Sequence, residues 1–304
     1  TYTDKKVLIT GHTGFKGSWL SAWLKCLGAQ VSGFSIGIPT RPSHFERNCI
    51  SSVDQDFRGD IRKYKELLEV VNSVQPDYVF HLAAQPIVRK SYEDPITTYE
   101  TNLLGSLNLL ESLRAIGSSS VVVMVTSDKC YENKEWIWGY RETDQLGGVD
   151  PYSASKAATE LMISSYVRSY CSPSNSSKII VGIGRAGNVI GGGDWAEDRI
   201  LPDAIRAHTT GENLLLRRPN STRPWQHVLE PLSGYLTLGA RLTNDIALHG
   251  EAFNFGPNVN VRRRSVGDII QEISNRGVDI SYLSENSTDT RRHESGLLKL
   301  NCEK

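Results

Sequence analysis

A glycine-rich turn near the start of the chain limits the possible folds more than any other feature. An apolar run at residues 7–9 ends at this turn, and a helix-like apolar pattern follows it. The turn reads Thr10-Gly11-His12-Thr13-Gly14-Phe15-Lys16-Gly17. Between a strand and a helix, glycines let the backbone approach a pyrophosphate, and the helix N-terminus offers free N–H groups. The glycines could serve the turn alone, but their position favours dinucleotide binding.

Short apolar runs alternate with amphipathic stretches as far as residue 185. The runs predict strands at 7–9, 31–34, 78–82, 121–125 and 179–183. The amphipathic stretches predict helices at 17–27, 64–74, 96–116 and 151–170. Such alternation predicts an α/β fold with a parallel, doubly wound sheet, the Rossmann fold.

The pattern changes after residue 185, where a glycine-rich loop is followed by predicted helices at 201–208 and 228–242 and a short strand at 252–255. We interpret this half as a smaller lobe from which some elements return to the main sheet. The expected division is a dinucleotide-binding domain at 1–187 plus about 224–259, and a substrate lobe at 188–223 plus about 260–304.

The composition excludes several classes of function. Lysine plus arginine and aspartate plus glutamate both total 34, so the zero net charge gives no reason to expect nucleic acid or an acidic membrane as a partner. The five cysteines are scattered and no histidine has zinc-ligand spacing, so we expect free thiols and no metal. We find no signal peptide or membrane-spanning run and expect a soluble cytoplasmic protein.

Tyr152 and Lys156 are the first candidates for catalysis. Pro151 suits the first turn of a helix, and the four-residue spacing places both side chains on one face. A nearby ammonium would lower the pKa of Tyr152 from about 10 and make it a general base. Tyr2 and Lys6 have the same spacing, so the spacing alone does not indicate a catalytic pair. Tyr152 and Lys156 are distinguished by their position, at the start of a predicted helix downstream of the 121–125 strand.

Polar side chains follow the strand at 121–125. Ser127, Asp128 and Lys129 supply a hydroxyl, a carboxylate and an amine at the carboxyl end of a strand, where doubly wound sheets bind ligands. The alternative is that Ser127 and Asp128 only cap a turn.

Other residues suit cofactor or substrate contacts. Asp60 could accept a hydrogen bond from an adenine amino group, or cap a helix that begins near residue 64. The 78–82 strand ends in small residues that would let backbone lie against a flat ligand, although tight helix–sheet packing explains them equally well. Guanidinium groups suit a diphosphate, although each arginine could instead be a solvated surface residue. The arginines of the second half are Arg185, Arg199, Arg217, Arg218 and Arg223.

Together these segments resemble the extended short-chain dehydrogenase/reductase family over nearly the whole chain. The motifs are Thr10-Gly11-x-x-Gly14-x-x-Gly17, Asp60-Ile61, His81-Leu82-Ala83-Ala84, Asn102, Tyr152-x-x-x-Lys156 and Asn254-Phe255-Gly256-Pro257. Within that family the chain resembles the nucleotide-sugar 4,6-dehydratases. Residues 11–19, 126–131, 147–153, 191–195 and 296–300 look like those of dehydratases that act on CDP-glucose.

The resemblance implies a lyase that uses NAD to convert CDP-glucose to its 4-keto-6-deoxy derivative, for deoxysugar and surface-polysaccharide synthesis. The implied catalytic residues are Ser127, Asp128, Lys129, Tyr152 and Lys156. The implied cofactor contacts are Gly11, His12, Thr13, Gly14, Phe15, Lys16, Gly17, Asp60, Ile61, Leu82, Ala83, Ala84, Asn102, Tyr152 and Lys156. The implied nucleotide-sugar contacts are Gln85, Asn188, Arg199 and Arg223.

The resemblance also implies a homodimer or a dimer of dimers, paired through the helices at 96–116 and 151–170. The alternatives are a nucleotide-sugar 4-epimerase, a dehydratase for a dTDP or GDP hexose, and a non-catalytic NAD-binding regulator. A regulator would not need Tyr152 and Lys156, and an epimerase would not need Asp128 and Lys129 to expel water.

The chain departs from its relatives at the acid/base pair. The related dTDP-glucose dehydratases carry Asp-Glu where this chain has Asp128-Lys129. If Asp128 is the acid, Lys129 is the base, and it must be neutral, with a pKa lowered from about 10.4. Glu132 and Glu135 are the alternative bases.

Two further departures concern the cofactor and the length. NAD-binding members usually end the second strand with an acidic residue, but residues 32–37 contain none. We therefore expect weaker NAD binding, with His12 or Lys16 compensating, while Arg41 could admit the 2′-phosphate of NADP. Relatives carry several dozen residues beyond Lys304, so we expect the second lobe to be incomplete.

Overall fold

The computed structural model describes residues 1–172, 177–216, 218–257, 264–284 and 296–304. Its centre is a seven-stranded sheet in which every neighbouring pair is parallel. The strands are β1 (Lys6–Thr10), β2 (Gln30–Ser35), β3 (Gln55–Arg58), β4 (Tyr78–His81), β5 (Val121–Val125), β6 (Ile180–Ala186) and β11 (Ala252–Phe255). The order β11-β6-β5-β4-β1-β2-β3 is that of a Rossmann-like sheet and reverses between β1 and β4, where such sheets bind ligands.

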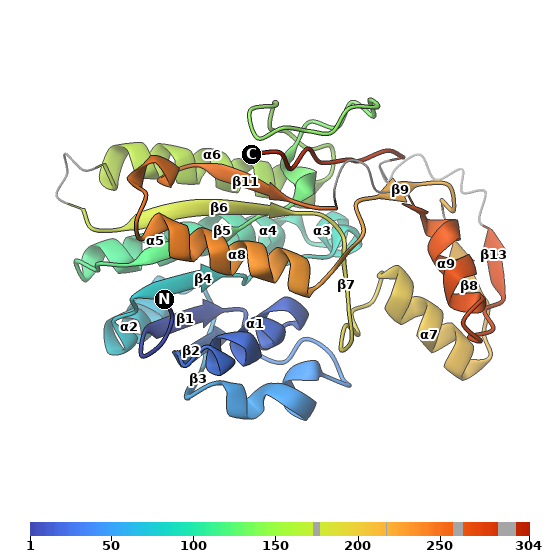
Figure 1. Ribbon diagram of the computed structural model, residues 1–304, viewed down its shortest axis with the longest axis horizontal. Coiled ribbons are helices and arrows are strands. Elements are labelled where there is room, and N and C mark those ends of the chain that lie inside the picture. Colours follow the sequence, from blue (N-terminus) through green and yellow to red (C-terminus); the bar gives the residue numbers. More distant parts are fainter. Residues whose placement is uncertain (173–176, 217, 258–263, 285–295) are drawn as a thin grey trace.

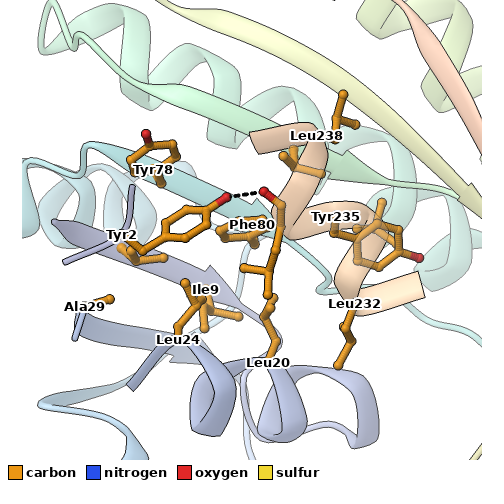
Figure 2. Close-up of a cluster of buried hydrophobic side chains, with 14 of the residues drawn as sticks. Tyr2, Ile9, Leu20, Leu24, Ala29, Tyr78, Phe80, Leu232, Tyr235 and Leu238 are labelled. Carbon is orange, nitrogen blue, oxygen red and sulfur yellow. Dashed lines mark hydrogen bonds between the residues drawn. The ribbon is translucent and has the colours of Figure 1, made fainter. Parts of the chain in front are cut away.

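Helices cover both faces of the sheet (Figure 1). One face packs on α1 (Phe15–Cys26) and α8 (Leu229–Leu242), and the core of that side includes Ile9, Leu24 and Tyr235 (Figure 2). The other face packs on α2 (Tyr64–Val74), α5 (Gly105–Ala115) and α6 (Pro151–Tyr170), with Leu8 and Val122 in its core. Successive strand residues enter opposite cores because side chains alternate along a strand, so these central strands are apolar on both faces.

The helices predicted at 64–74, 96–116 and 151–170 are confirmed, and the middle one contains a π turn that the sequence analysis did not predict. It consists of α4 (Pro95–Tyr99), a π-helical turn η3 (Glu100–Leu104) and α5. Asp94 caps α4 by accepting the N–H of Thr97 at 3.0 Å. The π turn contains Asn102, whose buried amide is hydrogen-bonded to neighbouring segments, and π turns are frequent at functional sites.

The second half forms a lobe beyond the carboxyl end of β6 (Figure 1). Its elements are β7 (Val189–Ile190), α7 (Ile200–Thr210), β8 (Leu214–Leu216), β9 (Thr222–Arg223), β10 (Gln226–His227), β12 (Arg264–Ser265), α9 (Val266–Ser274) and β13 (Tyr282–Ser284). A separate apolar cluster lies between α7, β8 and α9, and includes Ala204, Leu216 and Ile270. The domain boundaries predicted above stay a prediction.

The remaining short helices are η1 (Phe45–Cys49), η2 (Ile50–Ser52), α3 (Val88–Glu93), η4 (Asp128–Cys130) and η6 (Ile246–Leu248). All five cysteines are free thiols. Across the described residues, no helix has both the length and the hydropathy needed to cross a membrane.

Candidate active site

The glycine turn joins β1 to α1 at the switch point of the sheet. Gly11 has a φ of +78°, and a Cβ there would lie 2.7 Å from the backbone nitrogen of Ala83, in the loop after β4. A Cβ on Gly17 would lie 2.1 Å from the carbonyl oxygen of Gly11. Gly14 is the N-cap of α1, and it has no side chain with which to cap this helix. The turn therefore presents helix N–H groups beside backbone that has no room for side chains, which suits a pyrophosphate.

The side chain of His12 is committed to the fold. It is fully buried, with Nδ1 2.9 Å from Ser35 Oγ and Nε2 2.9 Å from Asp56 Oδ1. Gly33 leaves space for the ring, because a Cβ there would lie 2.3 Å from His12 Cγ. Burial lowers the pKa of His12 by more than Asp56 raises it. Both ring nitrogens have partners, so the ring has no free nitrogen with which to compensate for the missing acidic residue of β2.

The other residues of the turn contact β2, the core and α8. Thr13 Oγ1 donates to the carbonyl of Gly37 at 2.6 Å, and Phe15 is half-buried against the core. Lys16 Nζ lies 3.4 Å from the hydroxyl of Tyr235. Burial, followed by the nearby cationic groups, lowers the pKa of Lys16 to about 7. Lys16 is thus an amine that can change its charge near neutral pH.

Asp60 is paired with Arg62. Its carboxylate accepts the Arg62 backbone N–H at 2.9 Å and the Nη2 of the guanidinium at 2.6 Å. Burial raises the pKa of Asp60, but the Arg62 bonds outweigh it and hold the pKa below its ordinary value. Asp60 does not cap α2, whose N-cap is Lys63. Ile61 is buried against α5, where a Cβ on Gly105 would lie 2.5 Å from its Cδ1.

The loop after β4 lies against the glycine turn and the π turn. Leu82 N–H donates to the Thr10 carbonyl at 3.0 Å, and the adjoining Ala83 and Ala84 are half-buried. Asn102 accepts the N–H of Gln85 at 2.9 Å and donates to Ser155 Oγ at 2.9 Å. Asn102 therefore links this loop to α6, and its side-chain amide is hydrogen-bonded to protein groups.

The amide of Gln85 is likewise engaged. Its Nε2 donates to the Ile87 carbonyl at 3.1 Å and to Thr98 Oγ1 at 3.0 Å, and its Oε1 accepts the Ile87 N–H at 2.8 Å. Nε2 already makes two bonds, so a contact of this side chain with substrate would be accepted by the second lone pair of Oε1.

The five residues proposed for catalysis come from two neighbouring elements. Ser127, Asp128 and Lys129 lie at η4, directly after β5, and Tyr152 and Lys156 lie on the first turns of α6. The Ser127 hydroxyl lies 3.0 Å from Asp128 Oδ1, and Ser127 is close enough to the Tyr152 side chain to oppose the rise in its pKa. Lys129 Nζ lies 3.3 Å from Asp128 Oδ1, and Lys156 Nζ lies 3.5 Å from the carbonyl of Val125, the last residue of β5. The structure thus brings the predicted acid/base groups together.

Asp128 combines deep burial with an unused acceptor. The residue is 1% exposed, and its Oδ2 has no hydrogen-bond partner among the described residues. A buried carboxylate oxygen without a partner is costly, and it suits a group that holds a proton or bonds to substrate.

The expectation that the pKa of Tyr152 is lowered is wrong for this structure. Burial raises the pKa of Tyr152 to about 12, which the proximity of Ser127 and the charge of Arg199 only partly offset. Burial also lowers the pKa of Lys156 to about 8, opposed by the negative charge of Glu160. Desolvation dominates because both groups lie inside the protein, where a charge loses its water.

Of the four predicted substrate contacts, Asn188 lies just after β6, Arg199 and Arg223 lie in the second lobe, and Gln85 lies in the loop after β4. Asn188 is half-buried, and its Oδ1 has no partner among the described residues. Arg199, the N-cap of α7, has its Nη1 3.0 Å from Asp194 Oδ2. Arg223 Nη1 donates to the Thr222 carbonyl at 2.9 Å.

The structure corrects the assignment of Arg185 to a diphosphate site. This residue is 3% exposed, and its guanidinium is ion-paired with Glu160 on α6. Because the pair is buried in the fold, Arg185 is a structural group. Arg217 lies outside the described residues, and the Arg218 carbonyl accepts the N–H of Ser221 at 3.1 Å.

Sequence reasoning missed two residues of this region, Tyr235 and Glu160. Tyr235 is fully buried on α8, and its hydroxyl lies beside Lys16 and within electrostatic reach of Tyr152 and Asp128. Its helix has an ordinary apolar pattern, so no sequence signal distinguishes it from core. Glu160 stands four residues after Lys156, a spacing that could have suggested a contact.

The chain is similar to known proteins over most or all of its length. A family model described as GDP-mannose 4,6 dehydratase matches residues 8–298. The CDP-glucose 4,6-dehydratase of Salmonella typhimurium is 46% identical over 305 aligned residues, which cover 100% of this chain and 84% of that protein. The CDP-paratose 2-epimerase of Salmonella typhi is 29% identical over 54% of this chain and 53% of its own length.

Solved structures share the fold at lower sequence identity. The dTDP-glucose 4,6-dehydratase DesIV of Streptomyces venezuelae, solved with NAD and TYD, has a TM-score of 0.80 and 22% identity, and the match covers 97% of this chain and 88% of that one. The UDP-glucose 4-epimerase of Thermus thermophilus, solved with NAD, has a TM-score of 0.79 and 24% identity, over 97% and 90% of the two chains.

Proposed function

This chain belongs to the GDP-mannose 4,6-dehydratase family, and from that premise we propose that it is a lyase that converts CDP-D-glucose to CDP-4-keto-6-deoxy-D-glucose with loss of water. The observation that carries the proposal is 46% identity over the whole chain to a CDP-glucose 4,6-dehydratase. The cluster of Ser127, Asp128, Lys129, Tyr152 and Lys156 supplies the groups that such a reaction needs.

NAD is the cofactor that fits this site. The turn at Gly11 and Gly17 leaves no space for a Cβ, and the uncapped N-terminus of α1 is suited to a pyrophosphate. Bound NAD supplies the acceptor that takes hydride from carbon 4 of the sugar and later returns it to carbon 6. The loop at Leu82 and Ala83 would lie against the cofactor, and Asp60 would be near its adenine end.

The residues of this chain would move the protons. Tyr152, assisted by Ser127 and Lys156, would take the proton of the 4-hydroxyl as carbon 4 is oxidised. Because burial raises its pKa to about 12, the phenol must first lose its own proton to solvent, and the positive charge of a bound nicotinamide would favour that loss. The resulting 4-keto group acidifies the proton on carbon 5, which Lys129 removes. Asp128 gives a proton to the 6-hydroxyl, which leaves as water. The buried Asp128 and Tyr152 suit a site from which bulk water is excluded.

The nucleotide sugar would be held by the second lobe and the loop after β4. Asn188 offers an amide oxygen that is unpaired among the described residues, and Arg199 and Arg223 offer guanidinium groups for the diphosphate. Gln85 would shape the sugar pocket from the opposite side.

Turnover of CDP-, dTDP-, UDP- and GDP-hexoses, measured side by side, tests this function. We expect a 4-keto product, detected by its absorbance in alkali, with CDP-glucose as the preferred substrate. Preference for another nucleotide would replace the substrate assignment. A 4-epimer without loss of water would refute the lyase and favour an epimerase. As a control, Tyr152→Phe is expected to form no bound NADH.

We further propose a homodimer or a dimer of dimers, paired through the helices from α4 to α6. Large apolar side chains on this stretch are exposed, with Ile96 71%, Leu104 48% and Leu161 61% accessible. Sedimentation at micromolar concentration tests the assembly, and a monomer would refute it. We assign the reaction to deoxysugar synthesis for surface polysaccharide and place it in the cytoplasm. The free thiols support the cytoplasmic location, because thiols persist in a reducing compartment.

A further inference from the structure

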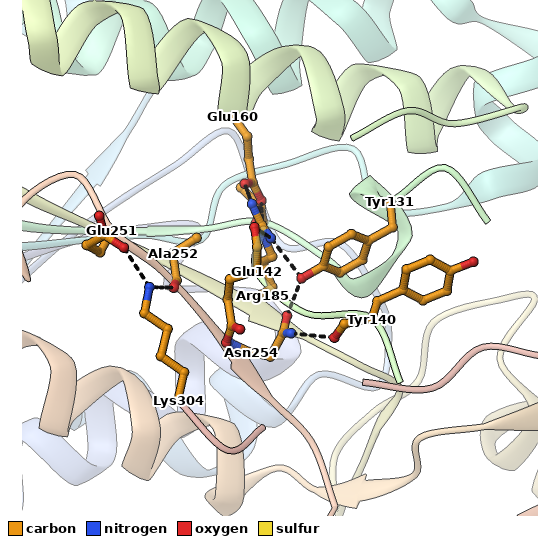
Figure 3. A network of polar contacts seen from close by, with 10 residues as sticks. Tyr131, Tyr140, Glu142, Glu160, Arg185, Glu251, Ala252, Asn254 and Lys304 are labelled. Atoms are coloured by element: carbon orange, nitrogen blue, oxygen red, sulfur yellow. Dashed lines mark hydrogen bonds and ion pairs between the residues drawn. The ribbon is translucent and has the colours of Figure 1, made fainter. Parts of the chain in front are cut away.

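One buried ion pair holds both ends of segment 126–131, which contains the proposed acid and base (Figure 3). At the upstream end, Glu160 Oε1 accepts a hydrogen bond from Thr126 Oγ1 at 2.6 Å. At the downstream end, Arg185 Nη1 donates to the Tyr131 hydroxyl at 2.7 Å. The Arg185 Nε lies 2.9 Å from both oxygens of Glu160, and the two side chains are 4% and 2% exposed.

Tyr131 is held from several sides. Its hydroxyl donates to Asn254 Oδ1 at 2.7 Å, and the Arg185 guanidinium lies 4.8 Å from its ring centroid. The ring of Tyr140 stacks on it with centroids 5.1 Å apart. Asn254 Nδ2 donates to the carbonyl of Tyr140 at 2.9 Å (Figure 3). It also donates to the carbonyl of Asn301 at 2.9 Å. The hydroxyl of Tyr131 thus links the ion pair to β11 and to the C-terminal segment.

The proposed oxidation residues are held differently. Tyr152 and Lys156 are on α6, a 20-residue helix, and the N–H of Tyr152 also donates to Ser91 Oγ at 3.1 Å. Asp128 and Lys129 lie instead on the three-residue turn η4, which ends just before Tyr131. Ser127, the third residue assigned to the oxidation, is the N-cap of η4 and lies four residues before Tyr131. A change at Tyr131 should therefore disturb the acid and base more than the residues of the oxidation step.

We propose that Arg185 and Tyr131 are positioning residues for the loss of water, and that their hydrogen bond fixes η4 so that Asp128 and Lys129 face carbon 5 and carbon 6 of the sugar. The inference rests on the proposed function, because that function assigns Asp128 and Lys129 to this step. A displacement of about 1 Å at a catalytic group can cost about 100-fold in rate.

Single-turnover kinetics with the NAD-loaded enzyme test the proposal, using whichever nucleotide hexose the wild type dehydrates. Bound NADH forms when carbon 4 is oxidised and disappears only after water has left. We expect Tyr131→Phe to form NADH at the wild-type rate and to consume it about 10- to 100-fold more slowly. Exchange of the carbon 5 proton with deuterated water should fall by the same factor.

Tyr140→Phe is the matched control. Its hydroxyl is also buried against a partner, the N–H of Lys134 at 2.6 Å, but it lies outside the Arg185–Tyr131 bond, so both phases should keep their wild-type rates. If Tyr131→Phe does not fold, Thr126→Val removes the upstream bond. Because Thr126 adjoins Ser127, this variant should slow consumption of NADH by a larger factor than its formation, and an equal effect on both phases would overturn the inference.

Unchanged consumption of NADH, or equal slowing of both phases, in Tyr131→Phe would overturn the inference while the proposed function stood. A wild type that forms no NADH with any of the four hexoses would overturn the proposed function itself.

Discussion

Alanine at two glycines of the same turn should separate folding from cofactor binding. In Gly17→Ala, the new Cβ would lie 2.1 Å from the Gly11 carbonyl oxygen and 2.7 Å from His12 Cα, both well inside ordinary van der Waals contact. These neighbours are backbone, so α1 must move away from the turn. Overpacking of this kind costs about 1–3 kcal/mol.

Gly14→Ala is the contrasting change. Gly14 has a φ of −73°, which alanine accepts, and among the described residues its Cβ would contact only the Gly11 carbonyl oxygen, at 3.3 Å. Because Gly14 is the N-cap of α1 and alanine is a poorer N-cap than glycine, we expect the free energy of unfolding to fall by about 0.5–1 kcal/mol. The methyl group, however, would occupy the face where backbone meets the pyrophosphate, so the Kd for NAD should rise at least about tenfold, or 1.4 kcal/mol.

Urea unfolding of the cofactor-free protein and calorimetric titration with NAD measure the two effects. Gly192→Ala is the control, because a Cβ there meets no described residue within 4 Å. Gly17→Ala should lower the melting temperature by roughly 2–8 °C, and Gly192→Ala should leave it unchanged. A Gly17→Ala protein as stable as the wild type, or a Gly14→Ala protein with wild-type affinity for NAD, would refute this account of the turn.

Three further changes test the charged groups. Lys129→Met should abolish exchange of the carbon 5 proton while NADH still forms, and exchange at the wild-type rate would exclude Lys129 as the base. In the folded protein the pKa of Lys16 is about 7, whereas its ordinary value is 10.5, so between these two pH values the unfolded chain binds more protons than the folded protein. The free energy of unfolding of the wild type therefore rises as the pH increases from 7 to 10.5. Lys16→Met should therefore be more stable below pH 7, by about 1–2 kcal/mol, with the difference closing toward pH 10 in urea unfolding. Glu160→Gln leaves Arg185 buried without its carboxylate and should cost about 3–5 kcal/mol in the same assay, whereas Glu272→Gln, in an exposed pair, should cost less than about 0.5 kcal/mol.

Local patterns in the sequence were sufficient for the architecture. The apolar run of β1 and the β-branched run of β5 predict buried strands, and the Pro151 start of α6 predicts a helix that places Tyr152 and Lys156 on one face. Each of these signals depends on residues close together in the chain, which a single sequence shows directly. The same locality explains why the glycine turn and the Ser127-Asp128-Lys129 group could be identified from the sequence.

Only the tertiary structure decided which distant groups meet and how far water is excluded from them. The Arg185–Glu160 pair joins β6 to α6, and Tyr235 reaches Lys16 from a helix more than 200 residues away. The pKa of Tyr152 rises because burial outweighs its stabilising partners, a balance that spacing along the chain does not contain. Sequence alone specifies the local elements and the residue types in them, whereas long-range pairing and desolvation exist only once the chain has folded.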